Sequence, residues 1–374
     1  MKIQVNNTEL LKTLTHIQSI VEKRNTKSIL SNVKISTKKN QLSFYTTDLD
    51  IFAKEVITAS VGGELITTTP IHMFYDIVRK IGGDKEVQLI FEPSDKPVKM
   101  LIRSGASEFS LPCLSAEEFP DFEEGKHDSE FNLPSDSLYY LIATTKHAIS
   151  SDDIRYYLNG IFLHVTEEKG VKVLRSIATD VHRLALSEIT LPENAVLLPD
   201  IIIPKKTVFE LVKLLENDQG QVYVGVSSNK ITVKVGNTTI VSKLVDGKFP
   251  DYNKAIPYGN SKLLKISTEK LAKAIDLVTT VSTEKIRAVK LKIQKNKVTL
   301  SVSDKMNSSS TSEIPAIYDN DEISIAFNAI YVLEVLKEIK GEKACFKVNS
   351  NNTAVLIEDS GNSNCKFVLM PLQV

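Results

Sequence analysis

The stretch PIHMFYDIVRKI, from Pro70 to Ile81, returns twice in related form. The copies are PKKTVFELVKLL, from Pro204 to Leu215, and NAIYVLEVLKEI, from Asn328 to Ile339. All three align without a gap, and an acid stands at the same position in each: Asp76, Glu210 and Glu334. Apolar residues recur at helical spacing, so we predict an amphipathic helix in every copy. A motif that returns at long, similar intervals predicts tandem structural units.

A second motif is also present three times. KIQVNNTELLKTL begins at Lys2, FNLPSDSLYYLIA at Phe131, and LKISTEKLAKAI at Leu264. In each, a short alternating strand is followed by polar residues and then by a helix whose apolar residues are four apart, such as Leu10 and Leu14. Between the helices the apolar period changes to two, which is typical of strands and hairpins. Strands interrupted by lone helices favour an α+β layered fold over a parallel sheet.

A repeated phrase marks the ends of the first two units. Glu118-Phe119-Pro120-Asp121-Phe122 and Lys248-Phe249-Pro250-Asp251-Tyr252 are each followed by a polar linker. We therefore predict three domains, at 1–122, 129–252 and 262–374. Such units are too large and too few for a solenoid, whose repeats run to roughly 20–45 residues.

Composition narrows the class of protein. The 374 residues carry 46 basic and 46 acidic side chains, and 42% are apolar, which excludes a disordered chain. A neutral chain is not a nucleic-acid binder by bulk charge, so any such contact must come from local placement of charge. No apolar run approaches the roughly 20 residues of a membrane span, and the polar N-terminus is unlike a secretory leader. Three scattered cysteines predict free thiols in a reducing compartment, the cytoplasm.

The sequence contains few motifs that indicate catalysis or the binding of a cofactor or metal. The sequence has no phosphate-binding glycine loop, no zinc-protease motif and no cysteine or histidine spacing suited to a metal, so we expect neither cofactor nor metal. Asp180-Val181-His182-Arg183 is the most catalytic-looking cluster, but a strand end with a packed histidine is the better interpretation. Arg155-Tyr156-Tyr157-Leu158 combines a cation with aromatic rings, which suits phosphate and bases or, alternatively, a strand edge. Lys205-Lys206 and Lys23-Arg24 are ambiguous in isolation.

Several phrases, in order along the whole chain, resemble the bacterial DNA polymerase III β subunits, the sliding clamps. They are Ile29-Leu30-Ser31-Asn32, Thr47-Asp48-Leu49, 154–160 (IRYYLNG), 178–185 (ATDVHRLA), 242–252 (SKLVDGKFPDY) and Met370-Pro371-Leu372. The resemblance implies a head-to-tail homodimeric ring around duplex DNA, with helices lining the hole and antiparallel sheets outside. Such a ring tethers the replicative polymerase, is opened by a separate clamp loader, and has no catalysis of its own. The alternatives are an enzyme centred on Asp180 and His182, and a repeat scaffold unrelated to DNA.

The resemblance also implies site residues. A hydrophobic cleft for short linear peptides of polymerases, loader and repair proteins would include Leu158, Thr179, His182, Arg183, Leu184, Pro250, Val368, Met370, Pro371 and Leu372. DNA contacts would be Arg24, Tyr156, Tyr157, Lys205 and Lys206. The dimer seam would pair Arg103–Ser110 with Lys305–Thr311, and includes Arg103, Ser107, Thr280 and Val281.

The chain departs from the family pattern at a few of these places. Val181 stands where the family usually has glycine, and His72-Met73 replaces a basic pair. Lys254-Ala255 and the Gln373-Val374 ending also differ from the usual residues. The location of the cleft is therefore better predicted than its peptide preference.

Overall fold

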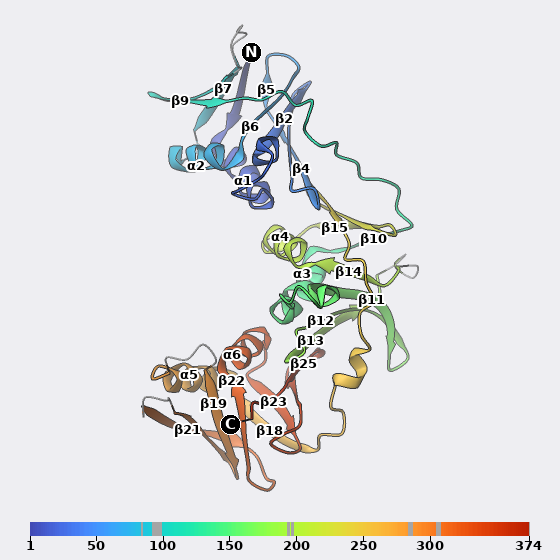
Figure 1. Cartoon of the computed structure of the whole chain (residues 1–374), viewed down its shortest axis with the longest axis vertical. Coiled ribbons are helices and arrows are strands. Elements are labelled where there is room, and N and C mark those ends of the chain that lie inside the picture. The colour runs from blue at the N-terminus through green and yellow to red at the C-terminus, as the bar shows by residue number, and fades with distance from the viewer. Residues whose placement is uncertain are drawn as a thin grey trace. The chain divides into compact units, whose positions relative to one another are not determined.

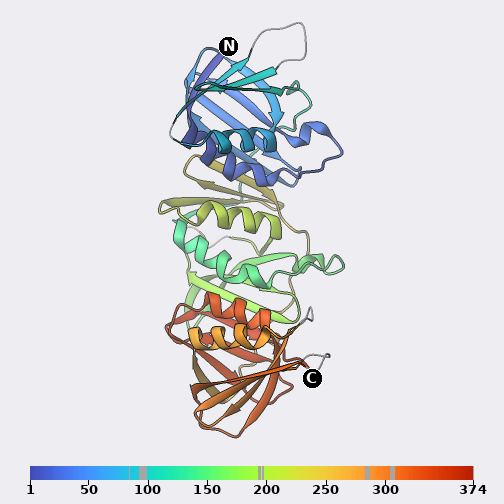
Figure 2. The ribbon, with the colours of Figure 1, turned by 90° about the vertical axis from the view of Figure 1, so that its left-hand side faces the viewer.

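The helices lie where the two repeated motifs predict them. In this computed structural model, which describes residues 1–83, 85–91, 99–192, 195, 198–282, 287–303 and 308–373, the helices are α1 (Asn7–Ile17), α2 (Ile71–Ile81), α3 (Ser135–Thr145), α4 (Lys205–Leu215), α5 (Thr268–Thr279) and α6 (Ala329–Glu338). Two of them are preceded by asparagines whose side chains accept backbone N–H groups, Asn6 for α1 and Asn328 for α6. Helix α1 packs on α2, and α5 on α6 (Figure 2).

The described chain divides into two compact units. The first comprises Met1–Tyr139, Pro192–Pro199 and Lys206–Leu244, and the second comprises Tyr140–Leu191, Asp200–Lys205 and Val245–Val374. The helices of the described residues are too short or too polar to traverse a bilayer. No group of three or more metal-ligating side chains occurs in the same residues.

Two antiparallel sheets form the first unit (Figure 1). The five-stranded sheet has the order β5-β1-β7-β8-β9, with β5 (Ser60–Val61), β1 (Lys2–Asn6), β7 (Glu86–Phe91), β8 (Lys99–Ser104) and β9 (Ser107–Pro112). The eight-stranded sheet has the order β10-β15-β16-β17-β4-β3-β2-β6, with β10 (Ser129–Pro134), β15 (Gln221–Val226), β16 (Lys230–Val235), β17 (Thr238–Lys243), β4 (Ile51–Thr58), β3 (Gln41–Thr47), β2 (Asn32–Lys38) and β6 (Leu65–Pro70).

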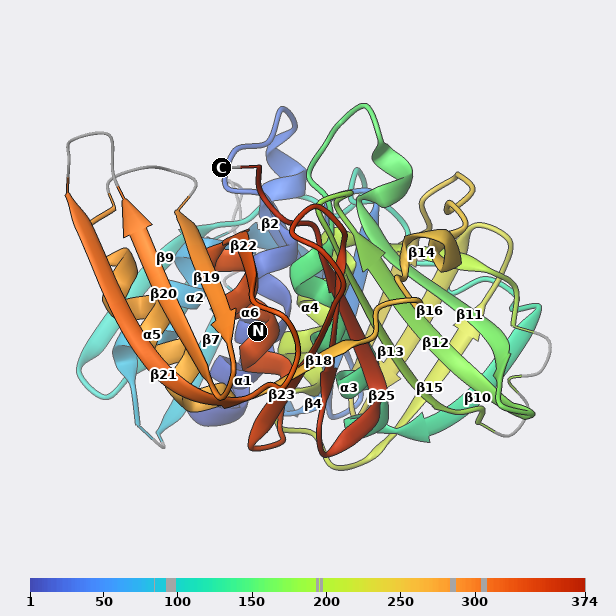
Figure 3. The same ribbon diagram turned by 90° about the horizontal axis from the view of Figure 1, so that it is seen from below.

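One sheet of twelve strands forms the second unit. In order, its strands are β14 (Ile201–Pro204), β11 (Gly160–Glu168), β12 (Val171–Thr179), β13 (Arg183–Thr190), β25 (Asn362–Leu369), β24 (Val355–Asp359), β23 (Lys343–Val348), β18 (Lys262–Ser267), β21 (Ser309–Ile317), β20 (Lys297–Ser303), β19 (Ala288–Gln294) and β22 (Ile323–Asn328). Figure 3 shows β19, β20 and β21 side by side, with α5 packed behind them. The α+β class with antiparallel sheets is confirmed.

The compact units do not coincide with the three repeats, because two sheets run across the repeat boundaries. Strand β17 of the second repeat pairs with β4 of the first, from Thr238 opposite Glu55 to Ser242 opposite Ile51. Strand β13 of the second repeat pairs with β25 of the third. The strands of the middle repeat are therefore shared between its two neighbours. Backbone hydrogen bonds, and not the side chains alone, hold consecutive repeats together.

Candidate functional site

The turn between β12 and β13 is built by the side chains of Thr179 and Asp180. The Thr179 hydroxyl accepts the N–H of Val181 at 3.2 Å. One oxygen of the Asp180 carboxylate accepts the N–H groups of His182 and Arg183, both at 3.0 Å. In such a turn, one carboxylate oxygen of the aspartate is bonded to the backbone of the next residues. This arrangement favours the strand-end interpretation of Asp180 and His182 over a catalytic pair.

The first repeat contains the same turn. The Thr47 hydroxyl accepts the N–H of Leu49, and the Asp48 carboxylate accepts the N–H groups of Asp50 and Ile51 at 2.9 and 2.7 Å. The third residue of each turn has a left-handed backbone, with φ of 80° at Leu49 and 74° at Val181. This conformation is unfavourable for a side chain with a Cβ, and most of all for a β-branched one. A glycine would occupy the position of Val181 without strain.

The second oxygen of each turn aspartate contacts a basic side chain. For Asp48 this base belongs to the next repeat, and for Asp180 it is Arg183, which in turn contacts the next repeat. Asp48 Oδ2 lies 2.6 Å from the amine of Lys206, at the start of α4. Asp180 Oδ2 lies 3.0 Å from Nε of Arg183. The Arg183 guanidinium also forms an ion pair with Glu334 and stacks over the ring of Tyr331, 4.1 Å from its centroid. The side chain of Arg183 thus joins the turn to α6.

The C-terminal segment is bonded on both sides. Leu184 lies opposite Val368 in the β13–β25 ladder. Beyond the ladder, the N–H of Met370 donates to the carbonyl of His182 at 2.9 Å, and the N–H of Leu372 donates to the carbonyl of Ala326 at 2.8 Å. Met370 itself is 45% exposed. The segment therefore has a fixed backbone and an accessible apolar side chain.

Beside this segment lies a cluster of buried apolar side chains. It consists of Leu158, Ile177, Leu184, Leu186, Ile202, Phe249, Tyr252, Ile256, Leu356 and Val368. Three of the predicted cleft residues, Leu158, Leu184 and Val368, belong to it. The other predicted residues are close along the chain to members of the cluster: Thr179, His182 and Arg183 in the turn before Leu184, Met370, Pro371 and Leu372 in the terminal segment after Val368, and exposed Pro250 next to Phe249. The structure thus brings these residues together within one unit.

The segment before β11 carries the predicted aromatic contacts. Tyr156, Tyr157 and Leu158 form one turn of 3-10 helix. Tyr156 is 53% exposed, Tyr157 packs on the buried cluster, and Leu158 is part of it. Arg155 is held by two hydrogen bonds from its guanidinium to Asp152, at 2.7 and 2.8 Å. These bonds, made to the charged form, lower the pKa of the Asp152 carboxyl.

The predicted basic contacts differ in their surroundings. Arg24 is exposed. Lys205 donates to the hydroxyl of Ser151. The amine of Lys206 instead contacts Glu22, Asp48 and the carbonyl of Ile20. Burial lowers the pKa of Lys206, but the carboxylates of Asp48 and Glu22 outweigh this effect, so the pKa is raised.

The predicted seam residues lie on β8, on β9 and at the end of α5. Arg103 and Glu108 form an exposed ion pair across β8 and β9, and Ser107 is exposed at the start of β9. At the end of α5, Thr280 is exposed and its hydroxyl donates to the carbonyl of Asp276, while Val281 is half-buried. Of the predicted 305–311 strand, residues 305–307 lie outside the described residues.

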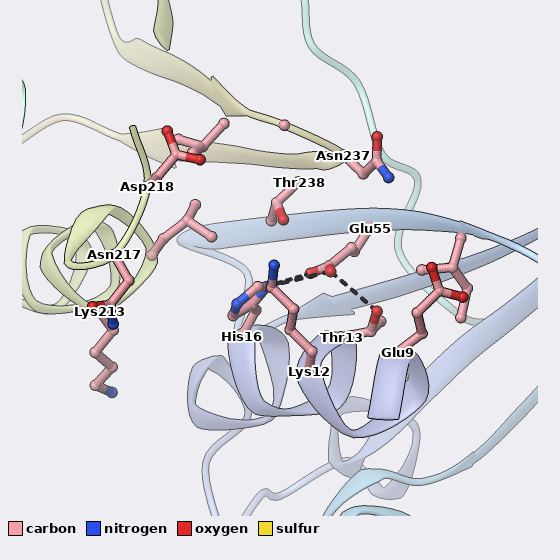
Figure 4. A pocket seen from close by; sticks show the side chains of 14 residues that line it. Glu9, Lys12, Thr13, His16, Glu55, Lys213, Asn217, Asp218, Asn237 and Thr238 are labelled. Atoms are coloured by element: carbon pink, nitrogen blue, oxygen red, sulfur yellow. Dashed lines mark hydrogen bonds and ion pairs between the residues drawn. The ribbon is translucent and has the colours of Figure 1, made fainter. Parts of the chain in front are cut away.

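A polar cavity of about 430 Å³ in the first unit brings acid, histidine and hydroxyl groups together (Figure 4). Glu55, which is buried, accepts a hydrogen bond from the Thr13 hydroxyl at 3.0 Å and contacts Nδ1 of His16 at 3.0 Å. Thr13 donates to the carboxylate and not to the imidazole. The cluster therefore lacks the nucleophile–base contact that nucleophilic catalysis requires.

A buried ionic network contacts the apolar cluster through the hydroxyl of Tyr252. The guanidinium of Arg175 donates to Glu188 at 2.6 and 2.8 Å, to Glu168 at 2.7 Å and to the hydroxyl of Tyr252 at 3.1 Å. The ring of His164 contacts the same hydroxyl at 3.1 Å. The network fixes Tyr252 and hence one wall of the cluster.

The contacts of α6 with Arg183 are not foreseen from the sequence. The repeat alignment singles out Glu334 as a recurring acid but gives it no role, and Tyr331 has no signal at all. Their partner, Arg183, is about 150 positions earlier in the chain. In the sequence, Phe249 and Tyr252 belong to the phrase that marks the end of the second unit, and in the structure both are members of the buried cluster.

Known proteins match this chain over its whole length. Residues 1–123, 132–251 and 253–373 match the N-terminal, central and C-terminal domains of the DNA polymerase III beta subunit. The beta sliding clamps of Caulobacter vibrioides and Escherichia coli are 39% and 32% identical, with 100% of both chains covered in each case.

Solved structures agree with this assignment. A beta sliding clamp of C. crescentus has a TM-score of 0.94 and 39% identity, covering 100% of this chain and 99% of its own. A sliding clamp of Bartonella birtlesii bound to griselimycin has a TM-score of 0.93 and 35% identity, with both chains fully covered. The chain belongs to the family of bacterial DNA polymerase III beta subunits, the beta sliding clamps.

Proposed function

We propose that two copies of this chain close head to tail into a ring around duplex DNA and tether the replicative polymerase to it. The observation that carries the proposal is the match of all three clamp domains, in order, over the full chain. The ring acts by topology and not by chemistry, so it needs no active site. A neutral chain suits this role, because phosphate attraction strong enough to grip DNA would oppose sliding.

We propose the predicted domain limits, 1–122, 129–252 and 262–374, as the three domains of the ring. Localisation in the cytoplasm follows from the replicative role and fits three free, buried cysteines. A clamp loader opens the ring, and repair proteins share the binding site with the polymerase.

Two strand edges support the dimer. Strand β9 ends its sheet, and the first part of β21 pairs on one side with β20, while its pairing with β18 is confined to Ala316 and Ile317. An unpaired strand edge presents free N–H and C=O groups, with which a strand of another chain can pair. We assign the seam to β9 of one copy and β21 of the other, with Arg103 and Ser107 on one side and Thr280 and Val281 on the other.

A charge on the seam tests this assignment. Phe109 on β9 is 37% exposed, and Phe109→Asp should shift the mass measured by sedimentation equilibrium from dimer toward monomer. The control is Ile66→Asp on β6, a side chain that is 63% exposed outside the proposed seam. Equal dimerisation of both variants would reject β9 as the seam.

For DNA, we propose contacts through Arg24, Tyr156, Tyr157 and Lys205. The three partners of the Lys206 amine favour a different role for this residue, which is to fasten α4 to the turn at Asp48. Arg24→Ala should slow loading onto DNA while peptide affinity stays unchanged. Lys206→Met should instead lower the stability of the first unit.

For partners, we propose that short linear peptides bind at the buried apolar cluster between the 179–183 turn and the terminal segment 370–372. An extended peptide with one or two large apolar side chains suits such a surface. Supporting this, the related clamp of Bartonella birtlesii holds griselimycin.

The direct test is processive synthesis on a primed circle. With polymerase, loader and ATP, the protein should lengthen the product made in one binding event by the polymerase. Product length that does not change on adding the protein would contradict the proposed function.

A further inference from the structure

We propose that one face of the eight-stranded sheet is a docking surface for an extended acidic segment of a partner protein. It is the face that carries Lys34, Lys54 and Lys234, and we call it the lysine face. All three lysines lie in the first compact unit, whereas every residue of the proposed peptide cleft lies in the second. The lysine face is therefore separate from that cleft and goes beyond the proposed function.

The register of the sheet aligns these lysines. Glu55 contacts Thr13 of α1, so the neighbouring side chain of Lys54 points to the opposite face. Directly opposite residues of antiparallel strands share a face. Successive lysines are two strands apart, which places their backbones about 10 Å from each other. The whole row on the lysine face consists of Thr68, Lys34, Tyr45, Lys54, Thr239, Lys234 and Tyr223.

Two of the lysines have no acidic partner among the described residues. The amine of Lys34 lies over the rings of Tyr45 and Phe119, 5.7 Å from each centroid. The amine of Lys54 lies 5.8 Å from the centroid of Tyr45. Both lysines are half-buried. Because aromatic rings offset only part of the cost of burying a cation, both amines would gain from a carboxylate of another chain.

The third lysine of the row already makes the type of contact that we propose. The amine of Lys234 lies over the ring of Tyr223, 5.2 Å from its centroid, and forms an ion pair with Glu124 at 2.6 Å. Glu124 belongs to the linker between the first two repeats, and Phe122 of the same linker packs edge-on against Tyr45. The linker thus presents an aromatic and an acidic side chain to this face. A partner segment can repeat the pattern at the two other lysines.

A second row beside the lysines has room for such a segment. It consists of Ile66, Ser36, Ser43 and Val56. Its middle members are short, and Ile66 is 63% exposed and offers apolar contact. An extended chain advances about 3.3 Å per residue, so acids three positions apart match the spacing of Lys34 and Lys54. The segment that fits therefore carries two such acids with an apolar residue between them.

The matching row of the second unit has different chemistry. Counted from the equivalent turns at Thr47 and Thr179, Leu186 takes the place of Lys54. The matching row reads Ile202, Phe162, Ile177, Leu186 and Lys366. Its apolar members belong to the buried apolar cluster or pack against it. Apolar peptide side chains therefore suit the second unit, whereas acidic ones suit the lysine face.

A peptide is favoured over nucleic acid by the linker. Glu118 and Glu123 are exposed, and each adjoins in sequence an aromatic residue that contacts the row, Phe119 and Phe122. A nucleic-acid strand carries a charge on every phosphate and would be repelled by these acids. A peptide can carry its two acids only where the lysines lie.

The experiment measures binding of the labelled peptide Gly-Ser-Asp-Phe-Ser-Asp-Ser-Gly to the full-length protein by fluorescence anisotropy. Lys34→Met and Lys54→Met should each weaken binding by roughly threefold to tenfold, as expected for the loss of one ion pair. Lys234→Met is the matched control and should bind within about twofold of wild type, because Glu124 already occupies its amine. The peptide with both aspartates replaced by asparagine should not bind. Griselimycin affinity should be unchanged in all three variants, which separates this surface from the proposed cleft.

Equal peptide affinity of the wild type and the double variant Lys34→Met/Lys54→Met would overturn the proposal, as would a wild type that does not bind the peptide. Equal weakening by Lys234→Met would also count against it. Tighter, Lys34-dependent binding of a single-stranded thymidine oligonucleotide would assign the face to nucleic acid and reject a protein partner.

Discussion

Val181 is a β-branched residue in a left-handed conformation, at the edge of the proposed cleft. Its backbone strain is worth roughly 1–2 kcal/mol, and glycine would recover this at an entropic cost of about 0.5–1 kcal/mol. We expect Val181→Gly to stabilise the protein by on the order of 1 kcal/mol.

The measurement is the urea midpoint of the second unit. Val171 is exposed to a similar extent but has an ordinary strand backbone, so Val171→Gly should lower the midpoint. A lower midpoint for Val181→Gly as well would show that the turn does not store this strain.

His147 is packed against Phe367 and close to the charge of Arg183. Burial first, and then the guanidinium, lower its pKa from 6.5 to about 3. Between these two values the unfolded chain binds a proton that the folded protein does not. Stability is therefore complete above pH 6.5 and falls as the pH drops, by up to about 1.4 kcal/mol per pH unit.

We expect His147→Phe to flatten the dependence of stability on pH between 6.5 and 4. Part of the slope should remain, because burial also lowers the pKa of His164. Unfolding midpoints measured at several pH values check this. A slope identical to that of the wild type would contradict the assignment.

At the scale of elements, the repeated sequences predict the helices closely, because amphipathic periodicity is a local property. The predicted helix at 204–215 is observed at Lys205–Leu215, and that at 70–81 is observed at Ile71–Ile81. The joining of β17 to β4 and of β13 to β25 could not be predicted, since strand pairing depends on residues far apart in the chain.

In the candidate site, too, the local features can be predicted from the sequence and the long-range contacts cannot. Thr179 and Asp180 build a turn from their own neighbours, so a phrase in the sequence identifies it. The ion pair of Arg183 with Glu334 joins two repeats, and no local sequence pattern predicts it. The same holds for the ion pairs of Lys206 with Asp48 and Glu22, which join residues far apart in the chain.

The strands β11, β12 and β13 are tied together by the buried guanidinium of Arg175. Arg175→Met would leave Glu188 buried without its partner, so we expect a loss of about 3–5 kcal/mol in the free energy of unfolding. Lys297→Met removes an exposed cross-strand pair with Glu313 and should leave unfolding unchanged. Similar unfolding curves for the two variants would refute a structural role for the Arg175 network.

At the scale of the whole molecule, the proposed dimer seam and the proposed cleft use different parts of the chain. Deletion of residues 370–374 removes the hydrogen bonds of Met370 to His182 and of Leu372 to Ala326, but leaves β9 and β21 intact. We expect loss of polymerase binding with an unchanged dimer mass. Wild-type affinity of the truncated protein for a fluorescent partner peptide would refute the assignment of the cleft.

The most direct test of the central claim compares two forms of one DNA molecule. Labelled protein is loaded with clamp loader and ATP onto a nicked circular plasmid, and half of the sample is then cut once with a restriction enzyme. Gel filtration measures the protein that stays with the DNA. We expect retention on the circle and loss from the linear form, since a ring slides off a free end. Equal retention on both forms would mean that the protein holds DNA by contact and does not encircle it.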